Sequence, residues 1–179
     1  GINLAEGDVL TKDREPFKLD GLGAYSIEQE LLNRYIKQKP IDSYHKILDA
    51  RDMLPEGWTG EQAFNQKLDL VKDFGDKINF ILDQKQLEDI EVEIDLENFR
   101  VVGRLTDIFE DALIAYRFGR SRPKDLVSIW IKHLIFQLVK PEPHDGISCL
   151  YTRDKDQPFA AYRLSPVDGA LTILKDLLT

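Results

Sequence analysis

The sequence predicts an α+β (α/β) fold in which a mixed sheet is flanked by helices. Three observations support this prediction. Apolar residues recur at helical spacing over residues 21–85, apolar and polar residues alternate as in strands over 86–118, and the remainder reads as helix, two strands and helix. The 179 residues are enough for one domain with a sizeable core, and they contain no internal repeat.

The domain organisation follows from the same patterns. Residues 1–20 are polar and irregular, and we expect them to form an extended lead-in from a larger subunit. Residues 21–179 are expected to form a single domain, with a helical part at 21–85 and a core of sheet and helix at 86–179.

Three helices are expected first. The first runs from Tyr25 to Pro40, and Ser26 with Gln29 has the spacing of an N-terminal capping box. A short helix is expected over 43–52 and a long one over 60–83. Gly75 inside the long helix costs about 1 kcal/mol relative to alanine and allows a kink there.

Three strands follow, over 88–96, 99–108 and 112–118, and we expect them to be antiparallel. In the first strand apolar residues alternate with acids, which is typical of a strand with one wet face. We therefore interpret these acids as a solvent-facing row rather than a cation site. The second and third strands are expected to be neighbours joined by a tight acidic turn.

The rest of the chain is expected to form a helix over 123–139, strands over 147–153 and 159–164, and a last helix to residue 178. Ser165 is the predicted N-cap of that last helix, and Pro166 its first residue. Cys149 lies in an apolar strand and is interpreted as a core thiol, and His133 as a partly buried side chain rather than a ligand.

Composition limits the partners. The net charge is −8, whereas an autonomous nucleic-acid binder is usually basic. DNA contact is therefore expected only through a local basic cluster, for which a solvated loop is the alternative interpretation; it consists of Arg117, Arg120, Arg122 and Lys124. The chain has no apolar run of about 20 residues, so no membrane partner is expected. Its single cysteine favours a reducing compartment, and we expect the cytoplasm.

Common catalytic signatures are missing from the sequence. It has no phosphate-binding G-x-x-x-x-G-K-[ST] loop, no paired histidines at zinc-ligand spacing and no G-x-S-x-G elbow. We therefore predict no cofactor and no metal site.

Short stretches spread over the whole chain resemble the C-terminal domain of the exodeoxyribonuclease V gamma chain (RecC) family. Their order and spacing together are specific, although no single stretch is. They read EPFKLDGL at 15–22, QELLN at 29–33, LPEG at 54–57, EIDL at 93–96, GRL at 103–105 and WIKHL at 130–134.

The resemblance implies a restriction-endonuclease-like (PD-(D/E)xK) core, as in the RecB/AddB nuclease domain, but without its active site. An active relative needs aspartates at positions 106 and 115 and a lysine at 117, where this chain has Thr106, Ala115 and Arg117. Threonine is a poor ligand for Mg²⁺, alanine is none, and arginine stays protonated. Active relatives also carry a histidine in the first helix, and Ile27 falls near that position.

The resemblance also implies a role. It predicts a non-catalytic domain that acts in subunit docking and DNA strand guidance within a RecBCD helicase–nuclease, an ATP-dependent exodeoxyribonuclease V of double-strand-break repair and recombination. The implied partners are RecB-type and RecD-type subunits, with DNA as part of the complex. Trp58, Phe159 and Tyr162 are candidate interface anchors, and a core role for each is equally compatible with the sequence.

Two other functions stay open at this point. One is an active metal-dependent DNA nuclease with a migrated site built on Asp107, Glu110 or Asp111, although strand alternation predicts that Asp107 faces away from Thr106. The other is a protein-interaction domain unrelated to recombination.

Overall fold

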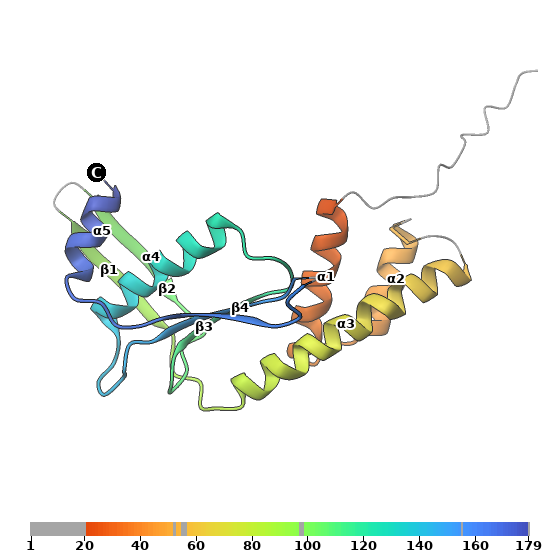
Figure 1. The fold of residues 1–179 in the computed structure, drawn as a ribbon, viewed down its shortest axis with the longest axis horizontal. Helices are drawn as coiled ribbons and strands as arrows, with labels where there is room; N and C mark the ends of the chain where they lie inside the picture. The colour runs from red at the N-terminus through yellow and green to blue at the C-terminus, as the bar shows by residue number, and fades with distance from the viewer. Residues whose placement is uncertain (1–20, 52, 55–56, 97–98, 155, 179) are drawn as a thin grey trace, which may run out of the picture.

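The computed structural model describes residues 21–51, 53–54, 57–96, 99–154 and 156–178 (Figure 1). The lead-in expected over 1–20 and the hairpin turn at 97–98 lie outside these residues. Within the described ranges no helix is long and apolar enough to cross a membrane.

The observed elements follow the predicted order. They are α1 (Gly21–Ile36), α2 (Ile41–Ala50), α3 (Trp58–Leu82), β1 (Ile90–Leu96), β2 (Phe99–Leu105), β3 (Leu113–Arg117), α4 (Pro123–Val139), β4 (Ser148–Thr152), β5 (Ala160–Leu164) and α5 (Ala170–Leu178).

The central sheet has the order β3–β4–β5, with β3 parallel and β5 antiparallel to β4. Alternate side chains of β3 point to opposite faces, as the pleat requires. Leu113 packs with Ile129 and Phe136 of α4, whereas Ile114 packs with the C-terminal end of α3. The two helices lie on opposite faces of the sheet (Figure 1). The prediction of a mixed sheet flanked by helices is therefore confirmed. Cys149 is buried on the α3 side, as expected of a core thiol.

The prediction of three antiparallel strands was wrong. Among the described residues β2 pairs with β1 and not with β3; the segment after β2 meets β3 through an isolated bridge between Ile108 and Leu113. The physical reason lies at Asp107, whose φ of 60° is left-handed and cannot continue an extended strand. The tight turn itself is present, because the Phe109 N–H donates to the Ala112 carbonyl at 2.9 Å.

The acids of β1 face solvent, as predicted. β1 and β2 form an antiparallel hairpin whose register runs from Ile90 opposite Leu105 to Leu96 opposite Phe99. Arg104 of β2 forms an exposed ion pair with Glu91, and Arg100 pairs with Asp95 at 3.3 Å. Cross-strand charge pairs explain the alternating acids without a bound cation.

Two predicted helix starts were wrong. α1 already begins at Gly21, so Ser26 lies inside the helix and does not cap it. α5 begins at Ala170 rather than at Pro166, because Gly169 has a φ of +72° that a helix cannot contain. The Ser165 carbonyl instead accepts a hydrogen bond from His133.

The helical part packs on the sheet through Phe74. This side chain of α3 is fully buried, and its ring lies edge-on to Phe118, just after β3, with ring centroids 5.7 Å apart. Phe159, just before β5, lies 5.5 Å from it on a second side. The helices and the sheet therefore share one apolar core at this point.

Gly75 allows α1 to approach α3 closely, and α3 continues through it without interruption. A Cβ placed on Gly75 would lie 2.5 Å from Cδ1 and 2.9 Å from Cε1 of Tyr35. The Tyr35 ring has little freedom to withdraw, because its hydroxyl donates to Asp76 at 2.5 Å. The glycine therefore serves packing between the two helices.

We expect Gly75→Ala to lower the free energy of unfolding by about 1 kcal/mol. Alanine favours the helix by about 1 kcal/mol, but overpacking against Tyr35 costs about 1–3 kcal/mol. Urea denaturation followed by circular dichroism measures the difference. Gly103→Ala is the control, since a Cβ there meets nothing within 4 Å. Equal stabilisation of both variants would contradict this packing role.

Candidate functional site

The three positions that the resemblance predicts to be degenerate lie around one groove between α1, β3 and α4. Ala115 and Arg117 of β3 line a cavity of about 230 Å³ against α4. Thr106 and Ala115 line a second cavity of about 220 Å³. The two cavities share Gln29, Ala115, Tyr116 and Lys132. The structure therefore brings Thr106, Ala115 and Arg117 together.

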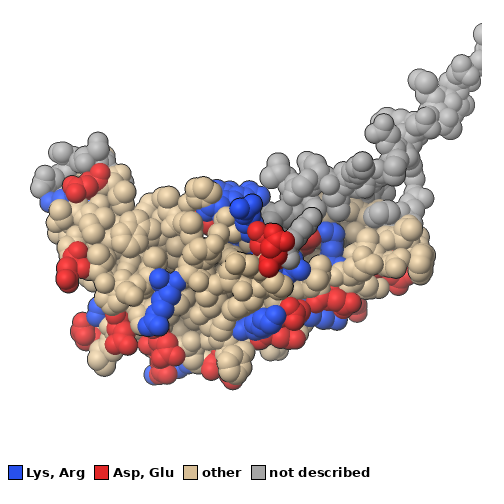
Figure 2. Space-filling model, viewed as in Figure 1, with Lys and Arg blue, Asp and Glu red and all other residues tan. Residues whose placement is uncertain are grey.

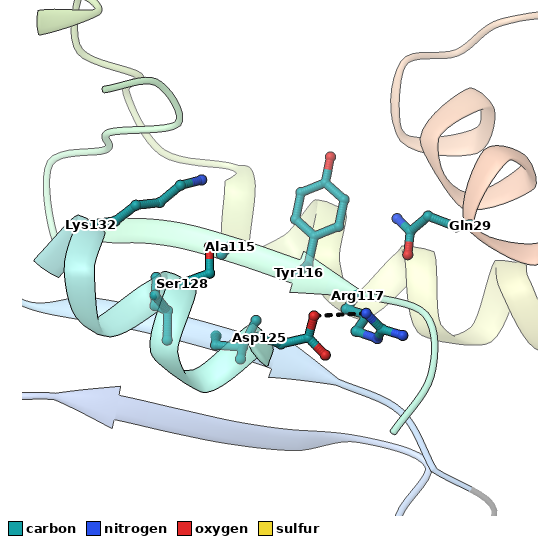
Figure 3. A pocket seen from close by; sticks show the side chains of 9 residues that line it. Gln29, Ala115, Tyr116, Arg117, Asp125, Ser128 and Lys132 are labelled. Atoms are coloured by element: carbon teal, nitrogen blue, oxygen red, sulfur yellow. Dashed lines mark hydrogen bonds and ion pairs between the residues drawn. The ribbon is translucent and has the colours of Figure 1, made fainter. Parts of the chain in front are cut away.

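Arg117 is turned inward and is paired with α4 (Figure 3). Its Nη1 donates to Oδ1 of Asp125 at 2.8 Å, and the two side chains are only 11% and 17% exposed. The other carboxylate oxygen, Oδ2, accepts from the Arg122 backbone N–H at 2.9 Å and so caps α4. Asp125 therefore neutralises the arginine and also fixes the start of the helix.

The expected orientation of Asp107 was wrong. The left-handed backbone at Asp107 breaks the strand alternation, so Thr106 and Asp107 line the same cavity. The Thr106 hydroxyl donates to Oδ2 of Asp107 at 2.8 Å. Burial, and then the charge of Asp107, raise the pKa of the neighbouring Tyr116 hydroxyl above its ordinary value.

The acids of the alternative migrated site do not converge. Asp111 lines a different cavity, together with Gln84, whose side chain accepts from the Asp111 backbone N–H at 3.1 Å. The Glu110 N–H donates to the Lys85 carbonyl. In the part of the chain that the structure describes, no three His, Cys, Asp or Glu residues are grouped so that they could hold a metal ion.

The first helix contributes Gln29 rather than Ile27 to the groove. Ile27 is 1% exposed and packs in the core, while Gln29 lines both cavities. The Gln29 side-chain oxygen accepts from the Phe118 backbone N–H at 2.9 Å and so ties α1 to the end of β3. From the sequence Gln29 was expected in a helix cap, and its contact with the end of β3 was not predicted.

Lys132 and Asp125 were also missed. Lys132 of α4 directly precedes His133, and its side chain lines both cavities. A sequence pattern does indicate the capping role of Asp125, because an acid at the third position of a helix that starts with proline fits a capping box. No sequence pattern indicates that Asp125 pairs with Arg117.

The predicted DNA-contact residues separate into two groups. Arg117 is buried against Asp125, whereas Arg122 and Lys124 are exposed at the start of α4. Arg120 is 83% exposed and lies 3.5 Å from Asp154. Figure 2 shows Lys and Arg side chains gathered near this end of α4.

The three candidate anchors differ in exposure. Trp58 is 73% exposed at the start of α3. Tyr162 is partly exposed, and its hydroxyl lies 2.7 Å from that of Ser121. Phe159 packs between Phe74 and Tyr151, so it has a core role.

His133 joins α4 to β4 and to the segment before α5. Its ring Nε2 lies 3.0 Å from the Ser165 carbonyl and its Nδ1 lies 2.9 Å from the Ser148 hydroxyl. A carbonyl only accepts, so Nε2 carries the hydrogen and Nδ1 accepts from Ser148. Burial lowers the pKa of this imidazole below its ordinary value, while the bond to Ser165 opposes that effect.

We expect the protein to lose stability as the pH falls from about 6.5 towards 5.5. The unfolded chain takes up a proton near the ordinary histidine pKa, whereas the folded state resists protonation at His133, so the unfolded state binds more protons. One such group contributes at most about 1.4 kcal/mol per pH unit. Urea denaturation at several pH values measures the slope. The slope should be smaller in His133→Gln, and an unchanged slope would contradict the assignment.

Comparisons with known proteins connect this site to one family. The model of the RecC C-terminal domain family matches residues 1–179. Relatives named RecBCD enzyme subunit RecC are 24% identical over 135 residues in Escherichia coli (strain K12) and 25% identical over 142 residues in Haemophilus influenzae. Each comparison covers 75% of this chain but only 12% of the relative's length.

A solved structure shares the fold. The crystal structure of a protein named "Putative exonuclease" from Eubacterium rectale superimposes with a TM-score of 0.51 at 10% identity. The match covers 86% of this chain and 63% of that one. At this identity the likeness concerns the fold alone, and it agrees with the predicted nuclease-like fold.

Proposed function

Because this chain belongs to the RecC C-terminal domain family, we propose that it is a non-catalytic, nuclease-like module of a RecC-type subunit. It docks RecB-type or RecD-type subunits of a RecBCD-type helicase–nuclease and helps to guide a DNA strand in double-strand-break repair and recombination. The chain spans 12% of the length of the curated relatives, so the role of the complete subunit is part of the proposal. The single cysteine favours the cytoplasm as the compartment.

The ion pair between Arg117 and Asp125 is the observation that supports a non-catalytic role. In active relatives, by resemblance, the positions of Thr106, Ala115 and Arg117 hold two metal-binding carboxylates and a lysine. Here the arginine is neutralised by Asp125, alanine has no ligand atom, and the Thr106 hydroxyl donates to Asp107. Hydrolysis of a phosphodiester by a metal mechanism needs a metal-activated water, which these side chains are poorly suited to hold.

The charge distribution favours docking as the main role and DNA contact as a secondary one. The chain is acidic overall, and affinity for DNA comes mostly from neutralised phosphates. Arg120, Arg122 and Lys124 are the exposed candidates for DNA contact, while Arg117 holds α4 in place.

A nuclease assay tests the non-catalytic part of the proposal. We expect the purified 179-residue chain to leave linear duplex and single-stranded DNA intact in Mg²⁺ or Mn²⁺. Cleavage that EDTA abolishes would overturn the proposal and favour a migrated metal site.

A pull-down with RecB-type and RecD-type subunits at two salt concentrations tests the docking part. Specific capture of one subunit supports a docking module. No capture, together with binding to forked DNA that weakens steeply with salt, would shift the role towards strand guidance.

A further inference from the structure

The outward face of α4 is apolar, which is unusual for a helix on the surface of a protein. Four apolar residues recur every three or four positions and therefore lie along one side of the helix; they are Val127, Ile131, Ile135 and Leu138, and we call them the outer α4 stripe. Val127 is 54% exposed, and Ile131 and Leu138 are more than one-third exposed. The opposite side of α4 is buried on the sheet. Ile135 is half-buried against the core, so the exposed part of the stripe consists of Val127, Ile131 and Leu138.

The surroundings of the stripe are basic in an otherwise acidic chain. The whole chain has 32 acidic and 24 basic residues. Between positions 120 and 140 the balance is reversed, because five residues are basic and Asp125, the one acid, is turned inward to Arg117. Figure 2 shows few charged side chains over α4 and a basic group beside its N-terminal end.

Two lysines border the stripe directly. Lys124 precedes Val127 by three residues and Ile131 by seven, so it lies on the same side of α4. Lys132 precedes Ile135 by three residues and borders the stripe on its inner edge. Both lysines are exposed, and their backbone positions are about 12 Å apart along the helix at about 1.5 Å per residue.

We infer that the outer α4 stripe is a docking site for an amphipathic helix of a partner protein, whose apolar side is bordered by acidic residues. The apolar side chains of the two helices interlock, and acids seven or eight residues apart on the partner reach Lys124 and Lys132. The inference rests on the proposed docking role and names the surface that performs it.

Charge and polarity favour this occupant over others. The same stripe on a second copy of the chain is also bordered by lysines, so it offers no acids to pair with Lys124 and Lys132. The phosphates of DNA can contact the lysines but gain nothing from the exposed apolar side chains of the stripe. An acidic amphipathic helix can pack its apolar side on the stripe and pair its acids with the two lysines.

Substitutions in the 179-residue chain test the inference, with the RecB-type and RecD-type subunits as probes. We expect Ile131→Asp to weaken capture about tenfold or more, because it places a charge in the middle of the stripe. Phe80→Asp is the matched control, since Phe80 is 84% exposed on α3 and lines cavities away from α4. Capture by the control should stay within about twofold of the unmodified chain.

A second variant tests the charged border of the stripe without a change in its apolar side chains. Lys124→Glu should weaken capture several-fold and make it less sensitive to salt, because an attractive charge is replaced by a repulsive one. Circular dichroism confirms that each variant is folded.

The possible outcomes separate the inference from the proposed function. Equal capture by the unmodified chain and Ile131→Asp overturns the inference but leaves the docking role intact. No capture by the unmodified chain contradicts the docking role itself, and the inference with it. If Ile131→Asp instead turns a dimer into a monomer, or abolishes binding to forked DNA, the stripe belongs to a second copy or to DNA and the inference is overturned.

Discussion

Phe74→Ala is expected to lower the free energy of unfolding by about 3–5 kcal/mol. The side chain is fully buried, and its ring contacts Phe118 and Phe159 at the ends of two sheet strands. Removing it leaves a cavity where the helical part meets the sheet, and neighbouring rings fill such a cavity only partly. Guanidinium denaturation followed by circular dichroism measures the loss.

Phe80→Ala is the control for this variant, because the same residue type on the same helix is 84% exposed. Its stability should change by less than about 0.5 kcal/mol. Similar losses in both variants would contradict the role of Phe74 as the contact between helices and sheet.

The two tryptophans can test whether residues 21–179 form a single domain. Trp58 lies at the start of α3 and Trp130 lies in α4, so each reports on one part of the chain. Trp58→Phe and Trp130→Phe variants isolate the two fluorescence signals. Coincident unfolding transitions are expected of one cooperative domain, whereas separate transitions would show two.

Asp125→Ala is expected to cost about 2–4 kcal/mol. The substitution removes a carboxylate from the buried Arg117 guanidinium, and leaving a charge in such an environment is costly. It also removes the acceptor for the Arg122 N–H at the start of α4, which contributes about 1 kcal/mol. The change is measured by urea denaturation.

Asp73→Ala provides the matched comparison. Asp73 also lies in a helix and pairs with a cation, Lys77, but its side chain is 59% exposed. Exposed pairs of this kind contribute about 0.5 kcal/mol or less. If Asp125→Ala costs no more than Asp73→Ala, the ion pair does not stabilise the fold.

A double-mutant cycle with Arg117→Met isolates the coupling between Arg117 and Asp125. Removing both charges should cost less than the sum of the two single substitutions, because no buried charge is left behind.

Local sequence patterns predicted some of the residues around the groove and not others. The pattern of residues 101–119, compared with active nucleases, predicted Thr106, Ala115 and Arg117 as one degenerate site, and the three residues line two cavities that adjoin each other. It did not identify Gln29 or Asp125, because their contacts join segments that are 89 and 8 residues apart and follow no local periodicity.

By itself, the sequence determined the order of helices and strands, the wet face of β1 and the buried thiol. These features depend on residue identity and on periodicities of two or 3.6 residues, which are local. Only the tertiary structure decided that β3 pairs with β4 rather than β2, that Asp107 turns to the side of Thr106, and that α4 keeps an apolar face outward. The orientation of Asp107 depends on one backbone angle, and the other two features depend on which distant surface is available for packing. The alternation of apolar and polar residues along the chain encodes neither.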